Sequence, residues 1–375
     1  MSSPRYRFAL ILSSQDSYAR GLMLGIGQWL RHYPHCLVRR FPQQFTKPAD
    51  LLEWKADGII HPFYNESAYR KYAAIGIPMI DVDFSCKGYP IARVAVDLAK
   101  VGQMAGTFFK EHSFRHVIFA TPDWAHDREA VAQSLAEHCG CDSETMVIPH
   151  ALEWDAAIRS QITAELHRRP KPCAILAHHD RLAYTLSILI RESGMIIPDE
   201  IALLGEGNDP DWCHLAYPAL SSIEIPTIAI GARAADRLLT IIESGQEDTT
   251  AEFLPPVALW RRRSTEIMVS KHPEVERALR FMRDHCHEGI GAQEVIGHCP
   301  GSKSRLQRHF KTETGQTLLE YLTQLRISRA CDLLRMTKLS AKEIADRCGY
   351  PSAQNFNLRF KTAMGLSPLQ WRAKK

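Results

Sequence analysis

The sequence has 375 residues, of which 45% are hydrophobic and 23% charged, with ten cysteines and no run of about 18 apolar residues. This composition is that of a globular protein of two or three domains and excludes a disordered, fibrous or membrane-spanning chain. The first apolar run is too short for a secretory signal and the cysteines are scattered, so we expect a cytoplasmic protein with reduced thiols.

The charge is distributed unevenly along the chain. Residues 271–375 carry 19 Lys and Arg against 10 Asp and Glu, a net charge of +9, whereas the preceding residues carry 27 against 32, a net charge of −5. A basic domain attached to an acidic body is typical of proteins that bind nucleic acid, although a basic face exposed only to solvent would give the same count.

The first 262 residues alternate strand and helix patterns. We predict strands at 7–12, 36–40, 58–61, 78–83, 116–121, 145–149, 174–178 and 201–205, with helices at 18–31, 98–112, 128–139, 157–168, 182–193 and 231–243. Single helices between strands indicate βαβ units and parallel sheets, and there are too many units for one sheet of ordinary size. The pattern predicts a two-lobed α/β body, with lobe 1 at about 5–113 and 225–250 and lobe 2 at about 114–222 and 251–262.

Beyond Pro255-Pro256 and a basic run, the strand patterns stop. We expect the body to end at residue 265, a linker at 266–273, and an all-α domain at 274–375. Ser340 followed by Glu343 fits a capping box at a helix start. The predicted helices are 274–285, 291–298, 302–313, 317–336, 341–347, 352–363 and 368–373.

One sequence motif of this domain occurs twice: residues 310–315 correspond to residues 360–365. Each copy reads as a short helix, a turn and a longer helix, which is the helix-turn-helix pattern. Ser302 and Ser352 are expected to cap the second helices. The helix between the copies would be roughly 30 Å long, which is close to the separation of about 34 Å between successive major grooves on one face of DNA.

The outward face of each second helix offers side chains that can read bases. Arg can bond two edge atoms of guanine, and Asn or Gln can do so with adenine. A single such face would suit an ordinary solvated helix equally well, but two copies on a basic background favour DNA binding. The candidates are Ser304, Arg305, Gln307 and Arg308 in copy one, and Gln354, Asn355 and Arg359 in copy two.

Residues 274–372 resemble the DNA-binding domain of the AraC family across the full double motif, most closely in IADRCGYPSAQNFNLRFKTAMGLSPLQWR. The resemblance implies that Ser304, Gln307, Arg308, Gln354, Asn355 and Arg359 face bases in double-stranded DNA. It also implies that Lys303, Lys311 and Lys361 contact phosphates, which positions a protein without specifying sequence. Leu358 departs from the family pattern, because some members carry a polar reader at this position.

The body resembles the LacI-like periplasmic sugar-binding fold over about 255 residues. In such two-lobed bodies small ligands bind where the strands end. Together with the AraC-type tail, the resemblance implies a ligand-responsive activator of sugar catabolic genes, with a xylose-like pentose as the monosaccharide effector. It further implies a homodimer and, for an activator, RNA polymerase as a partner.

Several polar and aromatic residues follow predicted strands of the body, where a ligand site is expected. A sugar requires carboxylates as acceptors, Arg or Asn as donors and an aromatic face, and this set supplies each. The alternative is that Arg128 and Asp180 are structural ion-pair partners and that Trp124 belongs to the core. The candidates are Tyr18, Arg20, Trp124, Arg128, Asp180, Asn208 and Asp209.

One position of this set departs from related sugar binders. Gly207 stands where those proteins carry Asp, so either Asp209 or Glu206 replaces that carboxylate or the ligand differs from the family's sugar. The sequence therefore leaves the identity of the effector open.

We predict neither a metal nor a cofactor. Residues 138–141 and 285–287 contain His and Cys but lack a second pair at a zinc-finger spacing. No phosphate-binding glycine loop and no nucleophile elbow occur. The main alternative is an enzyme acting on a small metabolite and fused to an AraC-type tail, and a second is an architectural DNA binder whose body senses nothing.

Overall fold

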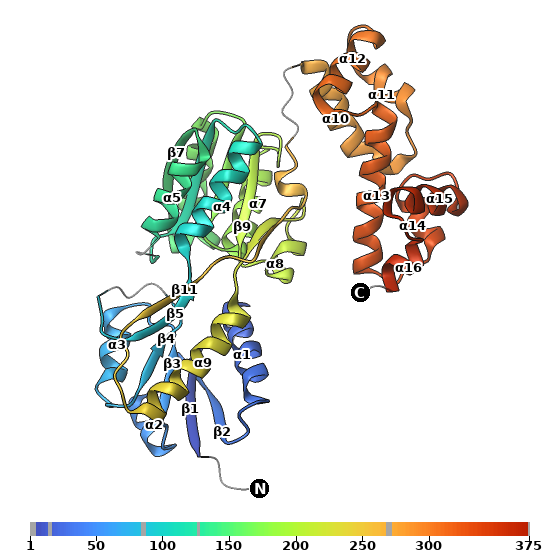
Figure 1. The fold of residues 1–375 in the computed structure, drawn as a ribbon. Helices are drawn as coiled ribbons and strands as arrows, with labels where there is room; N and C mark the ends of the chain where they lie inside the picture. The colour runs from blue at the N-terminus through green and yellow to red at the C-terminus, as the bar shows by residue number, and fades with distance from the viewer. Residues whose placement is uncertain (1–4, 14–16, 84–87, 126–127, 268–271, 374–375) are drawn as a thin grey trace. The chain divides into compact units, whose positions relative to one another are not determined.

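A computed structural model describes residues 5–13, 17–83, 88–125, 128–267 and 272–373. The chain forms two compact units, Met1–Ile267 and Met268–Lys375, called here the N-terminal and the C-terminal unit (Figure 1). Within the described ranges, no helix combines the length and the apolar character that a membrane span requires.

Lobe 1 of the N-terminal unit is built on a parallel six-stranded sheet with the order β11-β5-β4-β3-β1-β2. Buried side chains of α1 (Ser17–Leu30) and α9 (Thr227–Ser244) pack on one face, and those of α2 (Pro48–Glu53) and α3 (Glu66–Ala73) on the other. The strands are β1 (Tyr6–Leu12), β2 (Cys36–Pro42), β3 (Gly58–His61), β4 (Met79–Asp81), β5 (Ala92–Val96) and β11 (Ala251–Leu254).

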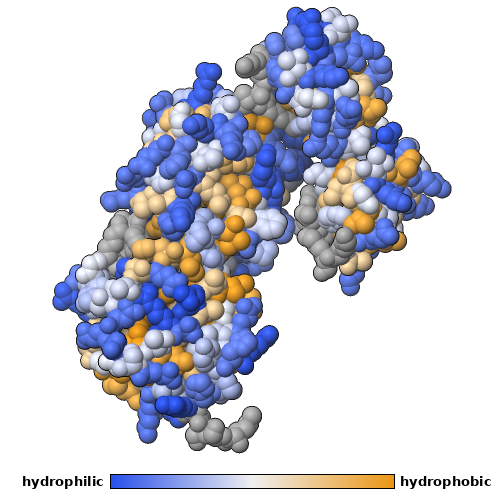
Figure 2. Space-filling model, in the orientation of Figure 1, coloured by the Kyte–Doolittle hydropathy of each residue, from blue (hydrophilic) through white to orange (hydrophobic). Residues whose placement is uncertain are grey.

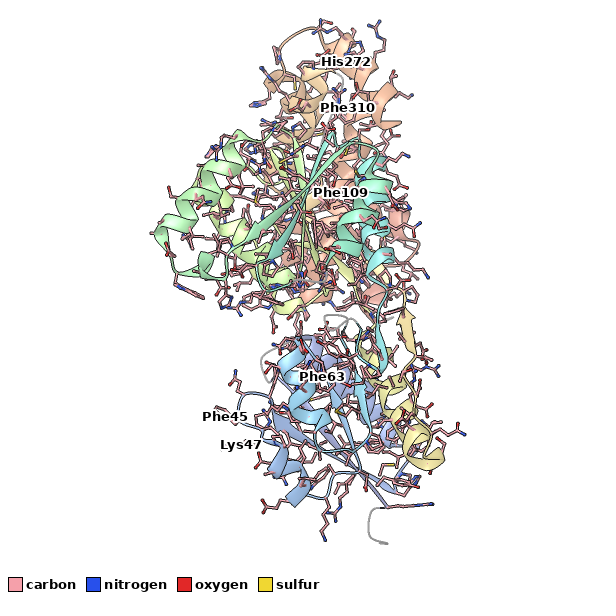
Figure 3. All side chains as sticks on the ribbon, turned by 90° about the vertical axis from the view of Figure 1, so that its left-hand side faces the viewer. Phe45, Lys47, Phe63, Phe109, His272 and Phe310 are labelled. Atoms are coloured by element: carbon pink, nitrogen blue, oxygen red, sulfur yellow. The ribbon has the colours of Figure 1, made fainter. Side chains whose placement is uncertain are left out.

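Lobe 2 repeats this plan with a sheet of the order β12-β10-β9-β8-β6-β7, in which β12 is antiparallel to β10. Its strands are β6 (His116–Pro122), β7 (Asp142–Ile148), β8 (Cys173–Ala177), β9 (Ile201–Glu206), β10 (Ser221–Glu224) and β12 (Ala258–Trp260). Its helices are α4 (Leu98–Glu111), α5 (Glu129–Cys139), α6 (Ala156–Arg168), α7 (Asp180–Glu192) and α8 (Pro210–Leu215). Figure 3 labels Phe63 in lobe 1 and Phe109 in lobe 2, both fully buried.

The chain crosses between the lobes after β5, after β10 and after β11. The crossing after β10 agrees with the prediction, but the expectation that lobe 1 extends to residue 113 is wrong, because α4 packs on α5 in lobe 2. The reason is a close helix contact. A Cβ added to Gly102 would lie 2.4 Å from the carbonyl oxygen of Val131, and one added to Gly106 would lie 2.9 Å from that of Leu135.

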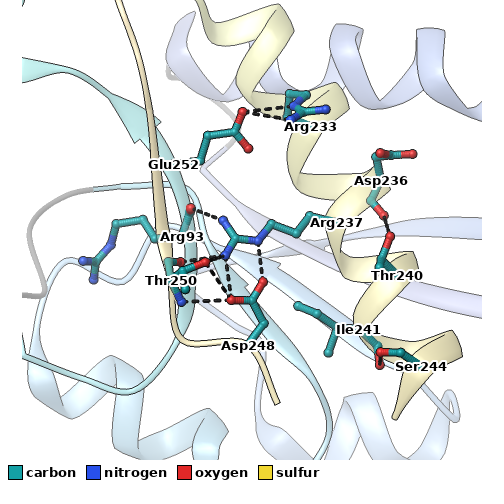
Figure 4. Close-up of polar contacts among 10 residues, drawn as sticks. All are labelled: Arg93, Arg233, Asp236, Arg237, Thr240, Ile241, Ser244, Asp248, Thr250 and Glu252. Carbon is teal, nitrogen blue, oxygen red and sulfur yellow. Dashed lines mark hydrogen bonds and ion pairs between the residues drawn. The ribbon is translucent and has the colours of Figure 1, made fainter. Parts of the chain in front are cut away.

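The structure also corrects the assignment of residues 251–262 to lobe 2, because β11 pairs with β5 in lobe 1. Arg237 of α9 fixes the segment that precedes β11 (Figure 4). Its Nε lies 2.6 Å from Oδ2 of Asp248, and its Nη atoms donate to the carbonyl oxygens of Arg93 at 2.9 Å and Thr250 at 2.8 Å. Only β12, after the two prolines, returns to lobe 2.

The exit of the N-terminal unit is attached to lobe 2. A short 3₁₀ helix (Arg263–Thr265) lies against β9 and β10. The Ser264 hydroxyl accepts a hydrogen bond from the backbone N–H of Ser221 at 2.8 Å and donates to the carbonyl of Leu203. The Thr265 and Ser221 hydroxyl oxygens are 2.7 Å apart. The last residues before the C-terminal unit are therefore held by one lobe.

The C-terminal unit is helical, with bounds close to the predicted ones, and hydrophilic side chains cover most of its visible face (Figure 2). The predicted caps are confirmed at Ser302, Ser340 and Ser352, each of which accepts a hydrogen bond from the backbone N–H three residues later. The helices are α10 (Pro273–His285), α11 (Ala292–His298), α12 (Lys303–Thr314), α13 (Leu318–Met336), α14 (Ala341–Arg347), α15 (Ala353–Met364) and α16 (Pro368–Ala373).

Helix α13 is shared by two hydrophobic cores, one for each copy of the repeated motif. Leu318 and Leu322 from its first half pack in the core that contains Phe310 (Figure 3). Ala330 and Leu334 from its second half pack in the core that contains residues 356 and 360. Because α13 has 19 residues, it spans about 28 Å.

The second copy and the segment just before the first copy meet near the middle of α13. Arg326 donates hydrogen bonds to the carbonyl oxygens of Cys286 at 2.7 Å and Ile290 at 2.6 Å, and its guanidinium lies 5.9 Å from the ring centre of Tyr350. Gly349 has a φ of 72°, and a Cβ on it would lie 2.5 Å from the carbonyl oxygen of Cys286. The two copies thus form one body with a fixed relative position.

Gly349→Ala tests this contact. The substitution should lower the free energy of unfolding of the C-terminal unit by about 2–5 kcal/mol, because backbone strain and steric overlap add. Gly365→Ala is the matched control, since Gly365 has the same φ of 72° with no atom within 4 Å of the added Cβ, and should cost only about 1–2 kcal/mol. Urea unfolding of both full-length variants gives the comparison, and equal losses would contradict the contact.

Candidate functional site

A cleft of about 420 Å³ lies between the lobes, where strands of both sheets end. Of the predicted ligand residues, Tyr18, Trp124 and Arg128 line it, while Arg20, Asp180, Asn208 and Asp209 do not. The full lining is Ser17, Tyr18, Tyr64, Asp83, Ala95, Val96, Leu98, Trp124, Ala125, Arg128, His178, His179, Glu206, Gly207, Ile225 and Thr227.

Arg128 is the cationic centre of the cleft. Its Nη1 lies 3.2 Å from Oε1 of Glu206, and its Nη2 lies 3.0 Å from Nε2 of His178. Arginine only donates hydrogen bonds, so Nε2 of His178 must be the acceptor and the ring is neutral. Burial and the neighbouring guanidinium lower the pKa of His178 well below its ordinary value. Burial also raises the pKa of Glu206, while Arg128 favours its ionised form.

Aromatic rings form one wall of the cleft. The Trp124 side chain is 48% exposed, and its ring is nearly parallel to that of His179, with 6.3 Å between centroids and 18° between planes. Burial lowers the pKa of His179 to about 4, so this ring is neutral at physiological pH. Tyr18 donates its hydroxyl proton to the carbonyl of Val82. The wall can stack against the C–H face of a small polar ligand.

Asp180 organises the loop behind the cleft and does not line the cleft itself. Its carboxylate accepts hydrogen bonds from the Ser222 hydroxyl at 2.6 Å and from the backbone N–H of Asp209 at 2.7 Å. A Cβ added to Gly207 would lie 3.2 Å from Asp180 Oδ2, so the carboxylate occupies the space beside this glycine. Of the two carboxylates expected to replace the missing Asp, Glu206 faces the cleft and Asp209 does not.

The side chains of Asn208 and Arg20 have other partners. Asn208, in the left-handed region with a φ of 52°, accepts a hydrogen bond from Arg262 at 2.7 Å. Arg20 on α1 of lobe 1 forms ion pairs with Asp209 at 3.2 Å and Asp211 at 3.5 Å, both of lobe 2. These ion pairs join the lobes outside the cleft lining.

The exposed faces of α12 and α15 form the candidate nucleic-acid interface. With 3.6 residues per turn, positions i, i+3, i+4 and i+7 share one face of a helix. On α12 this stripe contains the exposed residues Ser304, Gln307, Arg308 and Lys311. On α15 the equivalent exposed stripe contains Gln354, Asn357, Leu358 and Lys361. The repeat spacing of 50 residues could have identified Asn357, which the sequence analysis missed.

Three of the predicted readers lie off these stripes. Arg305 points towards α10, because its Nε lies 3.0 Å from Oε1 of Glu274. Asn355 corresponds to Arg305 in the repeat and is only half-exposed, and Arg359 corresponds to His309, which also contacts Glu274. Lys303 is exposed in the first turn of α12, as a phosphate contact requires.

Two domain families match the chain. The sequence pattern of a periplasmic binding protein-like domain matches residues 107–265, and that of a helix-turn-helix domain matches residues 301–374. The predicted fold class, a LacI-like two-lobed domain followed by an AraC-type double helix-turn-helix domain, is confirmed.

Relatives that cover the full length have the same combination. The xylose operon regulatory proteins of Escherichia coli and Haemophilus influenzae are 26% and 28% identical to this chain, over 99% of its length and 98% and 99% of theirs. A solved structure of the xylose-binding transcription activator XylR matches with a TM-score of 0.80 and 25% identity, covering 99% of this chain and 98% of the other. These relatives are transcriptional regulators.

Matches to single parts agree with this result. The activator RhaR from an Enterobacter species is 42% identical over 71 residues, 19% of this chain and 25% of RhaR. A LacI family regulator from Enterococcus faecium with bound ribose has a TM-score of 0.55 at 22% identity and covers 69% of this chain and 98% of its own, which shows a shared fold.

The buried carboxyl of Asp180 predicts a pH dependence of stability. Burial raises its pKa from 3.8 to about 6, so the folded state binds this proton more tightly than the unfolded state. Its stabilising contribution is therefore complete below about pH 4 and declines by roughly 3 kcal/mol as the pH rises through about 6.

Asp180→Asn removes this titration. The unfolding free energy of the native protein minus that of the variant should fall by roughly 3 kcal/mol between about pH 4 and pH 7, as measured by urea unfolding at several pH values. A difference that does not change with pH would show that Asp180 is not the titrating group.

Proposed function

We propose that this protein, an AraC-type transcriptional regulator with a periplasmic-binding-protein-like sensor, activates genes of sugar catabolism when an uncharged pentose binds between its lobes. The observation that carries the proposal is one cleft lined by both lobes, with an aromatic wall and neutralised charges, in the same chain as two exposed reading helices. A ligand that contacts both lobes favours the state in which they are closed, and it shifts the equilibrium by its difference in affinity for the two states.

The charges of the cleft favour a neutral ligand. Its cation, Arg128, is paired with Glu206, and its two histidines are neutral. Asp83 adds a second carboxylate to the lining. A phosphate or carboxylate group on the ligand would meet these acids without an unpaired cation to receive it. Hydroxyl groups can use the same side chains as acceptors and donors, so a pentose fits better than a sugar phosphate.

The proposed assembly on DNA is a homodimer. A homodimer would present four reading heads to tandem sites on DNA, and an activator would contact RNA polymerase. Since the protein must reach DNA, we expect it in the cytoplasm.

The relatives named above are regulators, and the cleft is proposed to bind its ligand without converting it. Incubation with pentoses followed by NMR should reveal no product, and turnover would favour the enzyme alternative.

The whole function is tested on selected DNA. Oligonucleotides enriched from a random pool by the full-length protein give its preferred site, and footprinting then compares protection with and without each pentose. We expect a pentose to change the protected region. Failure of the protein to protect any site, in the presence or absence of sugar, would contradict a regulatory role.

Trp124→Ala tests the sugar-binding wall. The substitution should weaken pentose binding at least tenfold, or about 1.4 kcal/mol, as measured by thermal shift against a panel of pentoses and pentose phosphates. Trp154→Ala is the matched control, because Trp154 is 63% exposed in the same lobe but does not line the cleft. Equal thermal shifts for both variants would place the ligand elsewhere, and a larger shift with the phosphates would exclude a neutral effector.

Leu358→Ala tests the reading stripe of α15. Leu358 is 66% exposed beside Gln354, and an apolar side chain on a reading helix can contact the methyl group of thymine. Replacing the contacted thymine of the preferred site by uracil should weaken binding by about 1 kcal/mol in the native protein and have no effect in the variant. Leu319→Ala, at a 52% exposed leucine of α13, is the control. A uracil effect that persists in Leu358→Ala would exclude this contact.

A further inference from the structure

Three potential metal ligands meet where the C-terminal unit begins. His272 precedes α10, Glu274 lies in its first turn, and His309 lies on α12, with one ligand atom from each within 4.8 Å of the others. The imidazole rings of His272 and His309 are stacked, with 3.7 Å between centroids, and Glu274 is only 7% exposed. Figure 3 shows the position of His272 in this unit.

The donor set suits a divalent transition metal. Two imidazoles and one carboxylate are a common zinc set, and Glu313 Oε1 lies 3.7 Å from His272 Nε2, near enough to supply a fourth ligand. Tetrahedral zinc, with bonds of about 2.0–2.1 Å, spaces its ligand atoms by roughly 3.4 Å. From separations of up to 4.8 Å, the ligand atoms must approach one another by up to about 1.4 Å, and the two stacked rings must rotate so that their in-plane lone pairs converge on one ion. His309 lies 35 residues after Glu274, so no zinc-finger spacing marks it in the sequence.

Glu274 at present has other partners. Its Oε1 lies 3.0 Å from Arg305 Nε and 3.0 Å from His309 Nδ1. The Arg305 side chain is 53% exposed, whereas the Glu274 side chain is 8% exposed, so the guanidinium can move into solvent while the buried carboxylate needs another cation in its place. A metal ion bound to Glu274 would replace the guanidinium in this way, and Arg305 would then become available to the DNA.

We propose that His272, Glu274 and His309 form a binding site for a divalent transition metal such as Zn²⁺, which ties the start of α10 to the reading helix α12 and releases Arg305. Metal binding itself does not depend on the function proposed above. The effect on Arg305 does rest on that function, so the two are measured separately.

The full-length protein is titrated with Co²⁺ and Zn²⁺ to test the site. We expect one tightly bound ion, visible d–d bands of tetrahedral Co²⁺, displacement by Zn²⁺, and X-ray absorption that shows imidazole and oxygen but no sulfur neighbours. The His272→Gln/His309→Gln variant should bind at least tenfold more weakly. The His285→Gln/His287→Gln variant is the matched control, because these histidines lie 3.0 Å and 3.8 Å from Glu288 in the same unit.

The outcomes are distinct. Equal affinity of the two double variants overturns the site, and so does a cobalt–thiolate band or sulfur scattering, which would assign the ion to cysteines. X-ray absorption of the native protein decides the matter even if a variant fails to fold. For the second part, Zn²⁺ should increase affinity for the preferred DNA severalfold in the native protein and not in Arg305→Ala. Tight metal binding without this increase overturns the link to Arg305.

Discussion

Arg128 brings a positive charge into a cleft formed by two lobes, and the surrounding groups are arranged around that charge. Glu206 neutralises this charge through one guanidinium nitrogen of Arg128. The other guanidinium nitrogen donates a hydrogen bond to Nε2 of His178, which must therefore remain unprotonated. A neutral His178 next to a neutral His179 leaves the aromatic wall uncharged beside Trp124. The result is a site that offers hydrogen bonds without a net attraction for anions. In the function proposed above, the chemical class of the ligand depends on this one ion pair more than on the number of polar side chains.

The C-terminal unit holds two small motifs at a fixed distance and orientation. Neither copy of the motif encloses its core alone, because each depends on half of α13. The shared helix sets the distance between the copies, and Gly349 of the second copy packs closely against Cys286, just before the first copy. Arg326 adds hydrogen bonds from α13 to the segment just before the first copy and a cation–π contact to the second. The order of the copies in the sequence thus becomes a rigid order in space.

The helical unit could be predicted closely from the sequence because its signals are local. Serine caps, a capping box and apolar residues at helical spacing lie within a few positions of the helix ends that they determine. The alternation of strands and helices in the body was visible too, but β5, α2, α3 and α8 were missed. The assignment of elements to lobes was less so, because α4 and β11 are placed by contacts with distant segments. The spacing of Gly102 and Gly106 on α4 was a usable sign of close helix packing, but it does not indicate which helix is the partner.

The same limit applies to the cleft. Position after a strand selected Tyr18, Trp124 and Arg128, which line the cleft. It also selected residues outside the lining, whose side chains have other partners: Asp180 bonds Ser222, Asn208 bonds Arg262, and Asp209 pairs with Arg20. Glu206 ends β9 and His178 follows β8, yet their roles depend on the guanidinium that reaches them from another segment. On α12, the contact of Arg305 with Glu274 involves a residue from the preceding helix and cannot be read from the pattern of α12 itself.

The attachment of residues 263–265 to lobe 2 has a mechanical consequence. The chain leaves the N-terminal unit through residues 263–265, which are hydrogen-bonded to Ser221 and Leu203 of lobe 2. This exit segment therefore moves with lobe 2. A rotation of lobe 2 against lobe 1 displaces the exit segment, whereas a rotation of lobe 1 alone leaves the exit segment in place. Closure of the lobes can therefore move the exit segment only if another contact holds lobe 1 in place.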